Sequence, residues 1–427
     1  MEKIGVKNME ILSIGEKIKR ARIYKGYTLK DICCDKISIS KMSCIENGKI
    51  DPEGWVIDLV AKKLEADANY LKKDIKQQLE ENYNEIFSKP IKAEHEEILK
   101  YNLEYAEEYK YYTIAFNIMH LLFNYYLDIK DINSCQVNTS KYYNLCVKSG
   151  EENNTLIYYL DIGRYLYMGN EYFQAASYYN NVRKELLLKN SNNYKMIADS
   201  IYKEAECYLL LNNYERAYEI VVKLMEYIKY LSEEEYSSEI YNLIAILCVK
   251  VGNDKYDDYE KRSLELCKDN MTRKAGFLYS YGAAMIGTKL EEKAYGYICK
   301  AVDLYPEKDK FNYVNFIIEV IETLISINKM GMAQELSEKI LNYAIDLKND
   351  IFIEKAYYFK AVTMENNGQF QMKEMYMNLS LDILMKLGTK NQLYKRYLDM
   401  GNLYSTVHNT AEALKYFSLA INLSKKL

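Results

Sequence analysis

The sequence predicts an all-α protein: an N-terminal helix-turn-helix domain followed by a right-handed α-superhelix of tetratricopeptide-like repeats. Three observations predict this class. The 427 residues include only 3 Pro and 17 Gly, so few positions break a helix. Apolar residues recur three and four positions apart rather than alternating, as on the buried face of a helix. Beyond residue 150, one pattern of small and large residues returns about every 40 residues.

Charge and composition suggest three segments. We expect a helix-turn-helix domain over residues 1–75, a linker over 76–90, and a repeat domain for peptide binding and dimerisation over 91–427. The first 75 residues hold 15 Lys and Arg against 12 Asp and Glu, whereas the remainder holds 42 against 49. A mildly basic head on an acidic body is consistent with contact to phosphates.

Capping residues divide the head into short helices. Ser13 is placed to start the first helix, and Gly26 to end it. Thr28, with Asp31 three positions later, forms an acidic version of the capping box for a second helix. A third helix is predicted over residues 39–46, where Ser38 is the cap and Asn47-Gly48 the terminator. Asp51-Pro52 is expected to start a fourth helix, whose apolar face is Val56, Leu59, Val60 and Leu64.

The spacing of these residues matches a known family. Thr28-x3-Ile32, Ile37-Ser38, Met42 and the run from Ile45 to Lys49 resemble the Cro/repressor-type (XRE) helix-turn-helix. With no insertion between Ile32 and Met42, the segment is similar to the head of the peptide-responsive RRNPP regulators. The resemblance implies that the second helix of the motif enters the major groove. Carried over by position, the DNA-binding residues are Ser38, Ile39, Ser40, Lys41, Ser43, Cys44 and Lys49.

The head departs from the family pattern at three positions. Leu29 stands where a phosphate-binding Gln is common, and Ile39 and Cys44 replace polar readers. We therefore expect weak direct readout, with more reliance on Lys contacts and DNA shape. An alternative is a head that has lost DNA affinity and mediates dimerisation. Arg22 and Glu46 fall where the family often pairs an arginine with a glutamate, and we expect a structural role for both.

Internal repeats define the body. The C-terminal copy has Gly401 and Ala413 where two helices cross, with Tyr404 and Phe417 filling the surrounding gap. Corresponding positions recur upstream at Gly163, Ala205, Ala245, Gly282, Ile321, Ala361 and Gly401. Repeats of this length also resemble the RRNPP body. Residues 91–150 are expected to add one or two helix pairs, although the repeated pattern of small and large residues is not evident there.

The first helix of each repeat is expected to line a concave wall. The predicted peptide-binding residues on that wall are Arg164, Tyr167, Tyr202, Glu206, Asn242, Tyr279, Glu322, Tyr358 and Asn402. Asn amides bond a peptide backbone through both donor and acceptor, and Arg164 suits a carboxylate. The resemblance implies a short signalling peptide in this groove.

The sequence does not indicate a metalloprotein, a cofactor-binding protein or an enzyme. His95, His120 and His408 lie in separate repeats, nine cysteines lack any CxxC spacing, and nucleotide-binding and hydrolase motifs do not occur. We therefore expect no metal, no cofactor and no enzymatic activity. With neither a secretory signal nor a membrane-spanning segment, a cytoplasmic protein is expected.

Together these features predict a homodimeric, quorum-sensing transcription regulator that binds a near-palindromic operator in double-stranded DNA. The alternative is a tetratricopeptide scaffold that binds a protein partner such as a response regulator, with a vestigial or dimerising head.

Overall fold

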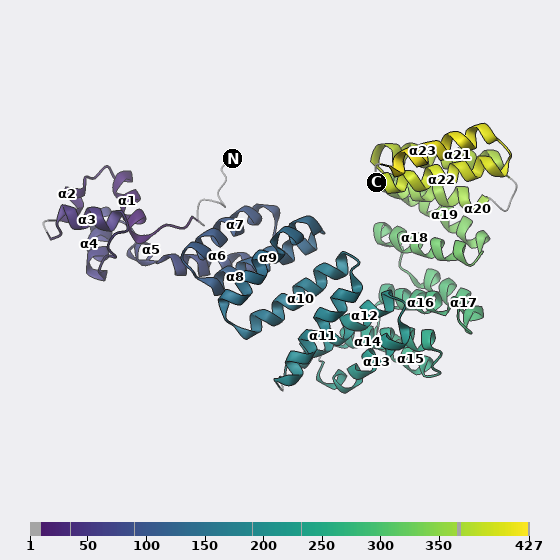
Figure 1. The fold of residues 1–427 in the computed structure, drawn as a ribbon, viewed down its shortest axis with the longest axis horizontal. Helices are drawn as coiled ribbons and strands as arrows, with labels where there is room; N and C mark the ends of the chain where they lie inside the picture. The colour runs from purple at the N-terminus through teal and green to yellow at the C-terminus, as the bar shows by residue number, and fades with distance from the viewer. Residues whose placement is uncertain are drawn as a thin grey trace. The chain divides into compact units, whose positions relative to one another are not determined.

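The computed structural model describes residues 10–34, 36–88, 90–189, 191–231, 233–364 and 369–425. Residues 1–9 of the predicted head therefore lie outside the described residues. The described segments contain helices and connecting turns and no β-strand, which confirms the all-α prediction (Figure 1). None of the described helices is both long and apolar enough to cross a bilayer. The chain divides into two compact units, Met1–Asn212 and Asn213–Leu427.

Five short helices form the head of the first unit. They are α1 (Ile14–Tyr24), α2 (Leu29–Cys33), α3 (Ile39–Glu46), α4 (Gly54–Leu64) and α5 (Ala68–Lys72). Their apolar faces meet in one small core, in which Ile18, Ile32, Met42, Ile45 and Val60 are fully buried. Burial of Met42 and Ile45 fixes the rotation of α3, so its other face is turned outward.

The predicted caps of the head are confirmed. Ser13 and Thr28 each form a reciprocal capping box, with Glu16 and Asp31 respectively. The Ser38 hydroxyl accepts a hydrogen bond from the Lys41 backbone N–H at 3.1 Å. Gly26 and Gly48 adopt φ values of +72° and +69°, a left-handed conformation that ends α1 and α3.

The fourth helix begins later than expected. Asp51-Pro52 was the predicted start, but α4 begins at Gly54 after an extended Glu53. The side chain of Glu53 caps nothing, because both of its oxygens are bonded elsewhere.

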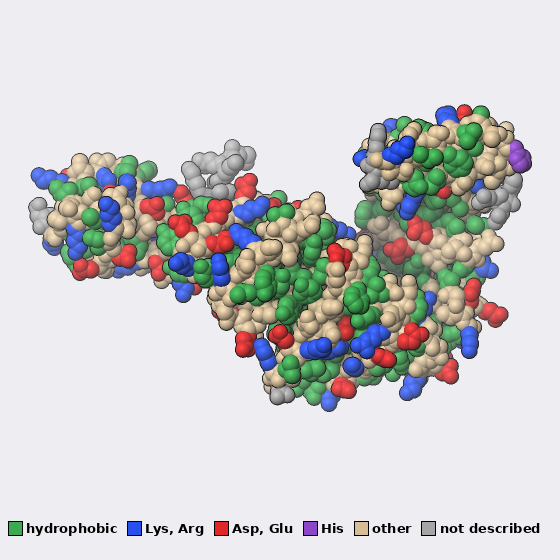
Figure 2. Space-filling view, viewed as in Figure 1, with side chains coloured by type: hydrophobic (Ala, Val, Ile, Leu, Met, Phe, Trp, Pro, Cys, Tyr) green, Lys and Arg blue, Asp and Glu red, His purple; other side chains and the backbone are tan. Residues whose placement is uncertain are grey.

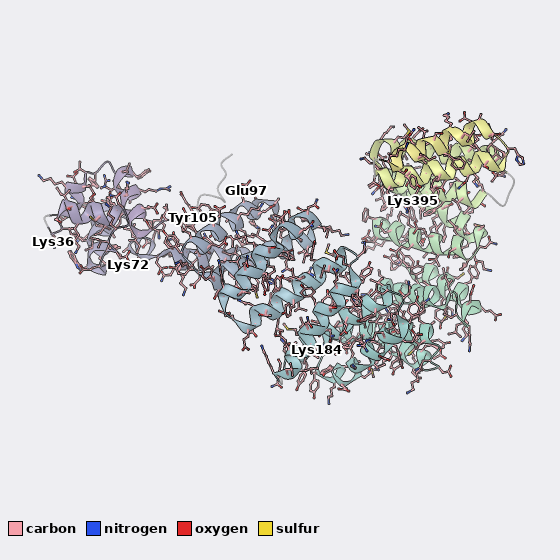
Figure 3. All side chains as sticks on the ribbon, viewed as in Figure 1. Lys36, Lys72, Glu97, Tyr105, Lys184 and Lys395 are labelled. Atoms are coloured by element: carbon pink, nitrogen blue, oxygen red, sulfur yellow. The ribbon has the colours of Figure 1, made fainter. Side chains whose placement is uncertain are left out.

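A packed helix occupies most of the segment expected as a linker. Helix α6 (Ile75–Phe87) buries Leu79 and Ile86 against α7 (Ala93–Glu108), in the same core as Leu99 and Leu103. Lys36 and Lys72 belong to the head and Tyr105 to α7 in Figure 3. The head is thus followed directly by helical structure that shares the core of the body.

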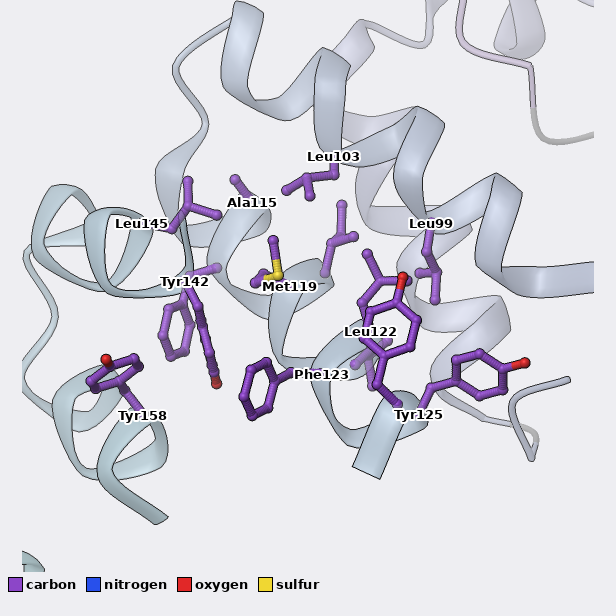
Figure 4. Packing of buried hydrophobic residues seen from close by; sticks show 14 of the residues in the cluster. Leu99, Leu103, Ala115, Met119, Leu122, Phe123, Tyr125, Tyr142, Leu145 and Tyr158 are labelled. Atoms are coloured by element: carbon purple, nitrogen blue, oxygen red, sulfur yellow. The ribbon is translucent and has the colours of Figure 1, made fainter. Parts of the chain in front are cut away.

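The rest of the first unit is built from long antiparallel helices. They are α8 (Tyr112–Asp128), α9 (Ile132–Ser149), α10 (Glu152–Met168), α11 (Tyr172–Leu188) and α12 (Tyr194–Leu210). Tyr142 lies at the centre of their core, with its ring centroid 5.2 Å from those of Phe116, Phe123 and Tyr158 (Figure 4). Tilted aromatic contacts of this kind stabilise a core beyond the area they bury.

The second unit continues the same pattern. It begins with α13 (Tyr214–Val221) and two 3₁₀ segments, Val222–Glu226 and Ile228–Tyr230. The longer helices that follow are α14 (Glu234–Val251), α15 (Tyr256–Leu266), α16 (Met271–Met285), α17 (Glu291–Leu304), α18 (Lys310–Ser326), α19 (Met330–Asp346), α20 (Asp350–Thr363), α21 (Phe370–Leu387), α22 (Lys390–Thr406) and α23 (Thr410–Ser424). Each even-numbered helix packs against the next odd-numbered one, and α14, α18 and α20 also contact neighbouring even-numbered helices.

The predicted repeat frame is confirmed by these helices. The seven anchor positions are buried and lie, in order, on α10, α12, α14, α16, α18, α20 and α22. A Cβ atom on Gly163 would lie 2.8 Å from the Tyr179 ring, and one on Gly401 would lie 2.5 Å from the Phe417 ring. Small residues at these crossings therefore let the paired helices approach closely.

Candidate functional site

The predicted DNA-binding residues lie on and beside α3. Ser38, Ile39, Ser40 and Lys49 are exposed, and Lys41, Ser43 and Cys44 are half-buried. Ile39 presents 49% of its surface to solvent at the first turn of the helix. The visible face of the head carries Lys and Arg side chains beside Asp and Glu (Figure 2). All seven residues therefore lie in one region. The start of α3 presents the apolar side chain of Ile39 and the hydroxyl groups of Ser38 and Ser40.

Lys41 is engaged with a neighbouring carboxylate. Its Nζ atom lies 3.0 Å from Oε1 of Glu53, and the indole N–H of Trp55 donates to Oε2 of Glu53 at 2.8 Å. These two bonds, first that from Trp55 and then that from Lys41, hold the pKa of Glu53 below its usual value. The amine predicted to contact DNA is therefore neutralised within the head.

Arg22 and Glu46 have the structural role that was predicted. The guanidinium donates from Nε and Nη2 to the two Glu46 oxygens at 2.7 and 2.8 Å, and from Nη1 to the Tyr27 carbonyl at 2.9 Å. Glu46 is only 4% exposed. This bidentate pair joins α1, the α1–α2 turn and the end of α3.

The residues before α1 join the head to the body, a contact that the sequence reasoning missed. Ile11 is fully buried in the core of α6 to α8. The Gln78 side-chain amide donates to the Leu12 carbonyl at 2.8 Å, and its oxygen accepts from the Leu12 N–H at 3.2 Å. Tyr101 on α7 donates to the Ile11 carbonyl at 3.4 Å. The apolar Ile11-Leu12 pair ahead of the Ser13 cap was the available signal.

A buried lysine makes a second connection between head and body. Lys17 on α1 is 1% exposed, and its Nζ donates to the Tyr70 carbonyl at 3.0 Å and the Lys73 carbonyl at 2.7 Å. The Tyr70 carbonyl belongs to the last turn of α5 and the Lys73 carbonyl follows that helix, where helix ends leave acceptors unpaired. Burial, and then the positive charge of Lys73, lowers the pKa of Lys17 to about 8.

In the first unit the predicted ligand residues are held between neighbouring even-numbered helices. Arg164 on α10 donates to the Asn124 amide oxygen and lies 3.3 Å from an Asp128 oxygen, both on α8. Behind it, the buried Asp161 accepts from the Tyr142 hydroxyl at 2.7 Å and lies 2.6 Å from Nδ1 of His120. A polar network therefore connects α8, α9 and α10.

The next contact joins α10 to α12. The Lys203 ammonium lies 5.8 Å from the Tyr167 ring centroid and 5.4 Å from that of Tyr202, within the range of a cation–π interaction. The same ammonium pairs with Glu206 at 2.7 Å. Tyr167, Tyr202 and Glu206 therefore meet around one lysine that was not among the predicted residues.

The second unit repeats the arrangement. The Tyr279 and Thr323 hydroxyls lie 2.8 Å apart, joining α16 to α18, and Glu322 pairs with Lys355 at 2.8 Å, joining α18 to α20. Arg396 on α22 stacks 3.6 Å from the ring centroid of Tyr358 on α20. Consecutive even-numbered helices are thus connected by polar contacts that include the predicted residues.

Asn402 and Asn242 differ from this pattern. Asn402 and Tyr358 share a cavity of about 250 Å³, which Asp399 and Lys373 also line. The buried Oδ1 of Asn242 has no hydrogen-bond partner among the described residues. No group of His, Cys, Asp and Glu side chains within the described ranges has an arrangement that could hold a metal ion.

Comparison with solved structures returns similar helical arrays. The apo form of the quorum sensor NprR from Bacillus thuringiensis is 17% identical, with a TM-score of 0.48 over 82% of this chain and 100% of that one. A Rap protein complexed with competence and sporulation factor is 14% identical, with a TM-score of 0.44 over 82% and 98%. Bacillus thuringiensis PlcR, in complex with the peptide PapR7 and DNA, is 15% identical, with a TM-score of 0.34 over 65% and 99%.

The first of these neighbours is a quorum sensor, and the other two were solved in complexes, one with a competence and sporulation factor and one with a peptide and DNA. With identities below 25% and TM-scores below 0.5, the comparison adds no argument to the fold assignment, which rests on the helix pairs themselves. No protein-family model and no curated protein matches the chain.

Proposed function

We propose that this protein is a homodimeric transcription regulator that binds double-stranded DNA through α3 and is controlled by a short signalling peptide. The observation that carries the proposal is the coexistence of two features in one chain. The head has side-chain caps on α1, α2 and α3 and an outward-facing α3, and the even-numbered helices of the body carry polar side chains. The first supplies a DNA-reading surface, and the second supplies groups for a peptide backbone.

The chemistry of α3 fits partial base readout. Ser40 can bond a base edge or a phosphate, and the exposed Ile39 suits the methyl group of thymine. Lys49 follows the helix and is exposed, as a phosphate contact requires. Such a surface gives modest sequence preference on top of salt-dependent attraction.

Peptide control would act on the contacts between repeats. The Arg164–Asp128 and Glu322–Lys355 pairs are substantially exposed, and exposed ion pairs contribute little, so a ligand can replace them at small cost. Replacing the α8–α10 contacts would alter how α10 packs on α8. Helix α8 contacts α6, which holds the N-terminal segment through Gln78. This route connects the ligand residues of the first unit to the head.

Selection from fragmented genomic DNA with the full chain, followed by salt titration of the best-bound duplex, tests the DNA component. We expect a sequence preference and an affinity that falls steeply with salt. The substitution Lys49→Ala should reduce the slope of log affinity against log salt concentration by about 1, the value for one lost phosphate contact. Absence of any salt-sensitive preference would overturn the proposal and favour a protein-binding scaffold. Sedimentation with pooled short peptides then tests dimerisation and peptide binding.

A further inference from the structure

The only Lys or Arg side chain of α3 is paired with a carboxylate from the residue that precedes α4. Lys41 is the sole Lys or Arg within Ile39–Glu46, and its Nζ lies 3.0 Å from Oε1 of Glu53. Glu53 is the residue immediately before α4, a position where Asp, Asn, Ser or Thr, rather than Glu, ordinarily bonds the first backbone N–H groups of a helix. Here it makes no cap bond and is turned toward α3. Both carboxylate oxygens of Glu53 are therefore bonded to side chains, one to Lys41 and one to Trp55, and neither is bonded to the backbone of α4.

Glu53 is held in place independently of Lys41. The indole N–H of Trp55 donates to Oε2 of Glu53 at 2.8 Å, which leaves Oε1 for the lysine. An exposed ion pair usually loses strength because both side chains must be ordered to form it. Because Trp55 already orders the carboxylate, less side-chain entropy is lost when Lys41 pairs with it. The bond from Trp55 also favours the ionised form of Glu53, since it lowers the pKa of the carboxyl group.

We propose that Glu53 is a specificity-determining residue of the head: it occupies Lys41 as an internal substitute for phosphate and so weakens binding to DNA of any sequence. This inference rests on the proposed DNA-binding function. Non-specific affinity comes almost entirely from cations that neutralise phosphates. A lysine retained by Glu53 makes no such contact, and the carboxylate itself repels the duplex. Lys41 leaves Glu53 only on a duplex that places a negatively charged acceptor where the lysine can reach it, so that this acceptor replaces the carboxylate.

The substitution Glu53→Gln tests this directly, because the amide oxygen still accepts from Trp55 while the charge is lost. We expect the affinity for a short random-sequence duplex to rise about two- to five-fold, as expected for removal of a surface ion pair. The logarithmic salt dependence should steepen by about 0.9, the value for one additional phosphate contact. Affinity for the best-bound selected duplex should rise less, so the ratio of specific to non-specific affinity falls.

Glu65→Gln is the matched control. Glu65 follows α4 at its other end, pairs with Lys25 at 2.9 Å, and gives the same change in net charge. It should leave the salt dependence unchanged. In a Lys41→Met background, Glu53→Gln should also lose its effect on the salt dependence.

The outcomes separate the two proposals. If the unaltered protein shows no salt-dependent DNA binding, the proposed function itself fails. If the unaltered protein binds DNA, the salt dependence of Glu53→Gln decides the second proposal. The role of Glu53 alone is refuted if that salt dependence equals the one of the unaltered protein or of Glu65→Gln. Trp55 is the single tryptophan of the chain and is 47% exposed, so its fluorescence reports directly on whether the head remains folded in each variant.

Discussion

The ammonium group of Lys17 lies 2.7 Å from the carbonyl oxygen of Lys73, at the point where the head meets the body. Lysine is almost never fully buried without a partner, and here the partners are two backbone carbonyls rather than a carboxylate. The charge is therefore hydrogen-bonded but not neutralised, which explains the lowered pKa of about 8.

The first prediction is that Lys17 makes the stability of the first unit depend on pH. Its pKa is about 8 in the folded chain and 10.5 as the ordinary value, so between these values the unfolded chain binds more protons. The free energy of unfolding should therefore gain a contribution that rises with pH from about 8 to about 10.5 and is absent below pH 8. Urea unfolding followed by Trp55 fluorescence, compared between the unaltered protein and Lys17→Met, isolates this contribution. If the free energy of unfolding depends on pH identically in both proteins, the lowered pKa is not that of Lys17.

The second prediction concerns Gln78. Replacement by Ala leaves the Leu12 N–H and carbonyl without their partner in a buried position, which should lower the free energy of unfolding by about 1–3 kcal/mol. Chemical denaturation measures the change. Glu80→Ala, on the exposed side of the same helix, should change it by less than about 0.5 kcal/mol. Equal effects from the two substitutions would mean that Gln78 does not fasten the N-terminal segment.

The third prediction tests the helix crossing at Gly401. Alanine there places its Cβ 2.5 Å from Cε1 of Phe417, so Gly401→Ala should destabilise the second unit by about 1–3 kcal/mol. Gly276 on α16 has open space around the same position, and Gly276→Ala should be neutral or stabilise by up to about 1 kcal/mol. Thermal unfolding of both variants provides the comparison, and loss of stability in both would point to a backbone rather than a packing effect.

The fourth prediction concerns the buried ion pair of the second unit. Arg396 donates to Glu354 at 3.0 Å, and both side chains are less than 10% exposed. Glu354→Gln removes the nearer of two counter-charges of the guanidinium, because Asp399 remains 3.8 Å from Nε, and should cost about 3 kcal/mol of stability, the lower end of the range for breaking a buried pair. Glu322→Gln breaks the exposed pair with Lys355 and should cost at most about 1 kcal/mol. Chemical denaturation that gives similar losses for both would contradict the distinction between buried and exposed pairs.

Local chemistry made much of the fold predictable. Ser13, Thr28 and Ser38 cap their helices within three residues, so the bonds they make are visible in the sequence alone. The anchors from Gly163 to Gly401 were found because close helix crossings demand small residues at a regular interval.

Contacts between residues far apart in the sequence could not be predicted from these local patterns. Ile11 and Leu12 form an apolar pair ahead of the Ser13 cap, but the sequence does not show which helices this pair packs against. The face of Arg164 was predicted, but its partner Asn124 is 40 positions away on another helix. Helical periodicity gives the direction of a side chain and leaves the identity of the opposing residue open, which is why Lys203 and Lys355 were missed.

The burial of Ile11 has a practical consequence for exchanging heads between related proteins. A fragment cut at residue 75 would strip this isoleucine of its apolar surroundings and leave Leu12 without Gln78. Chimaeras joined there would pair a foreign N-terminal segment with an α6 and α7 shaped for another sequence. A functional graft should instead carry everything up to the end of α7, so that both sides of the joint come from one parent.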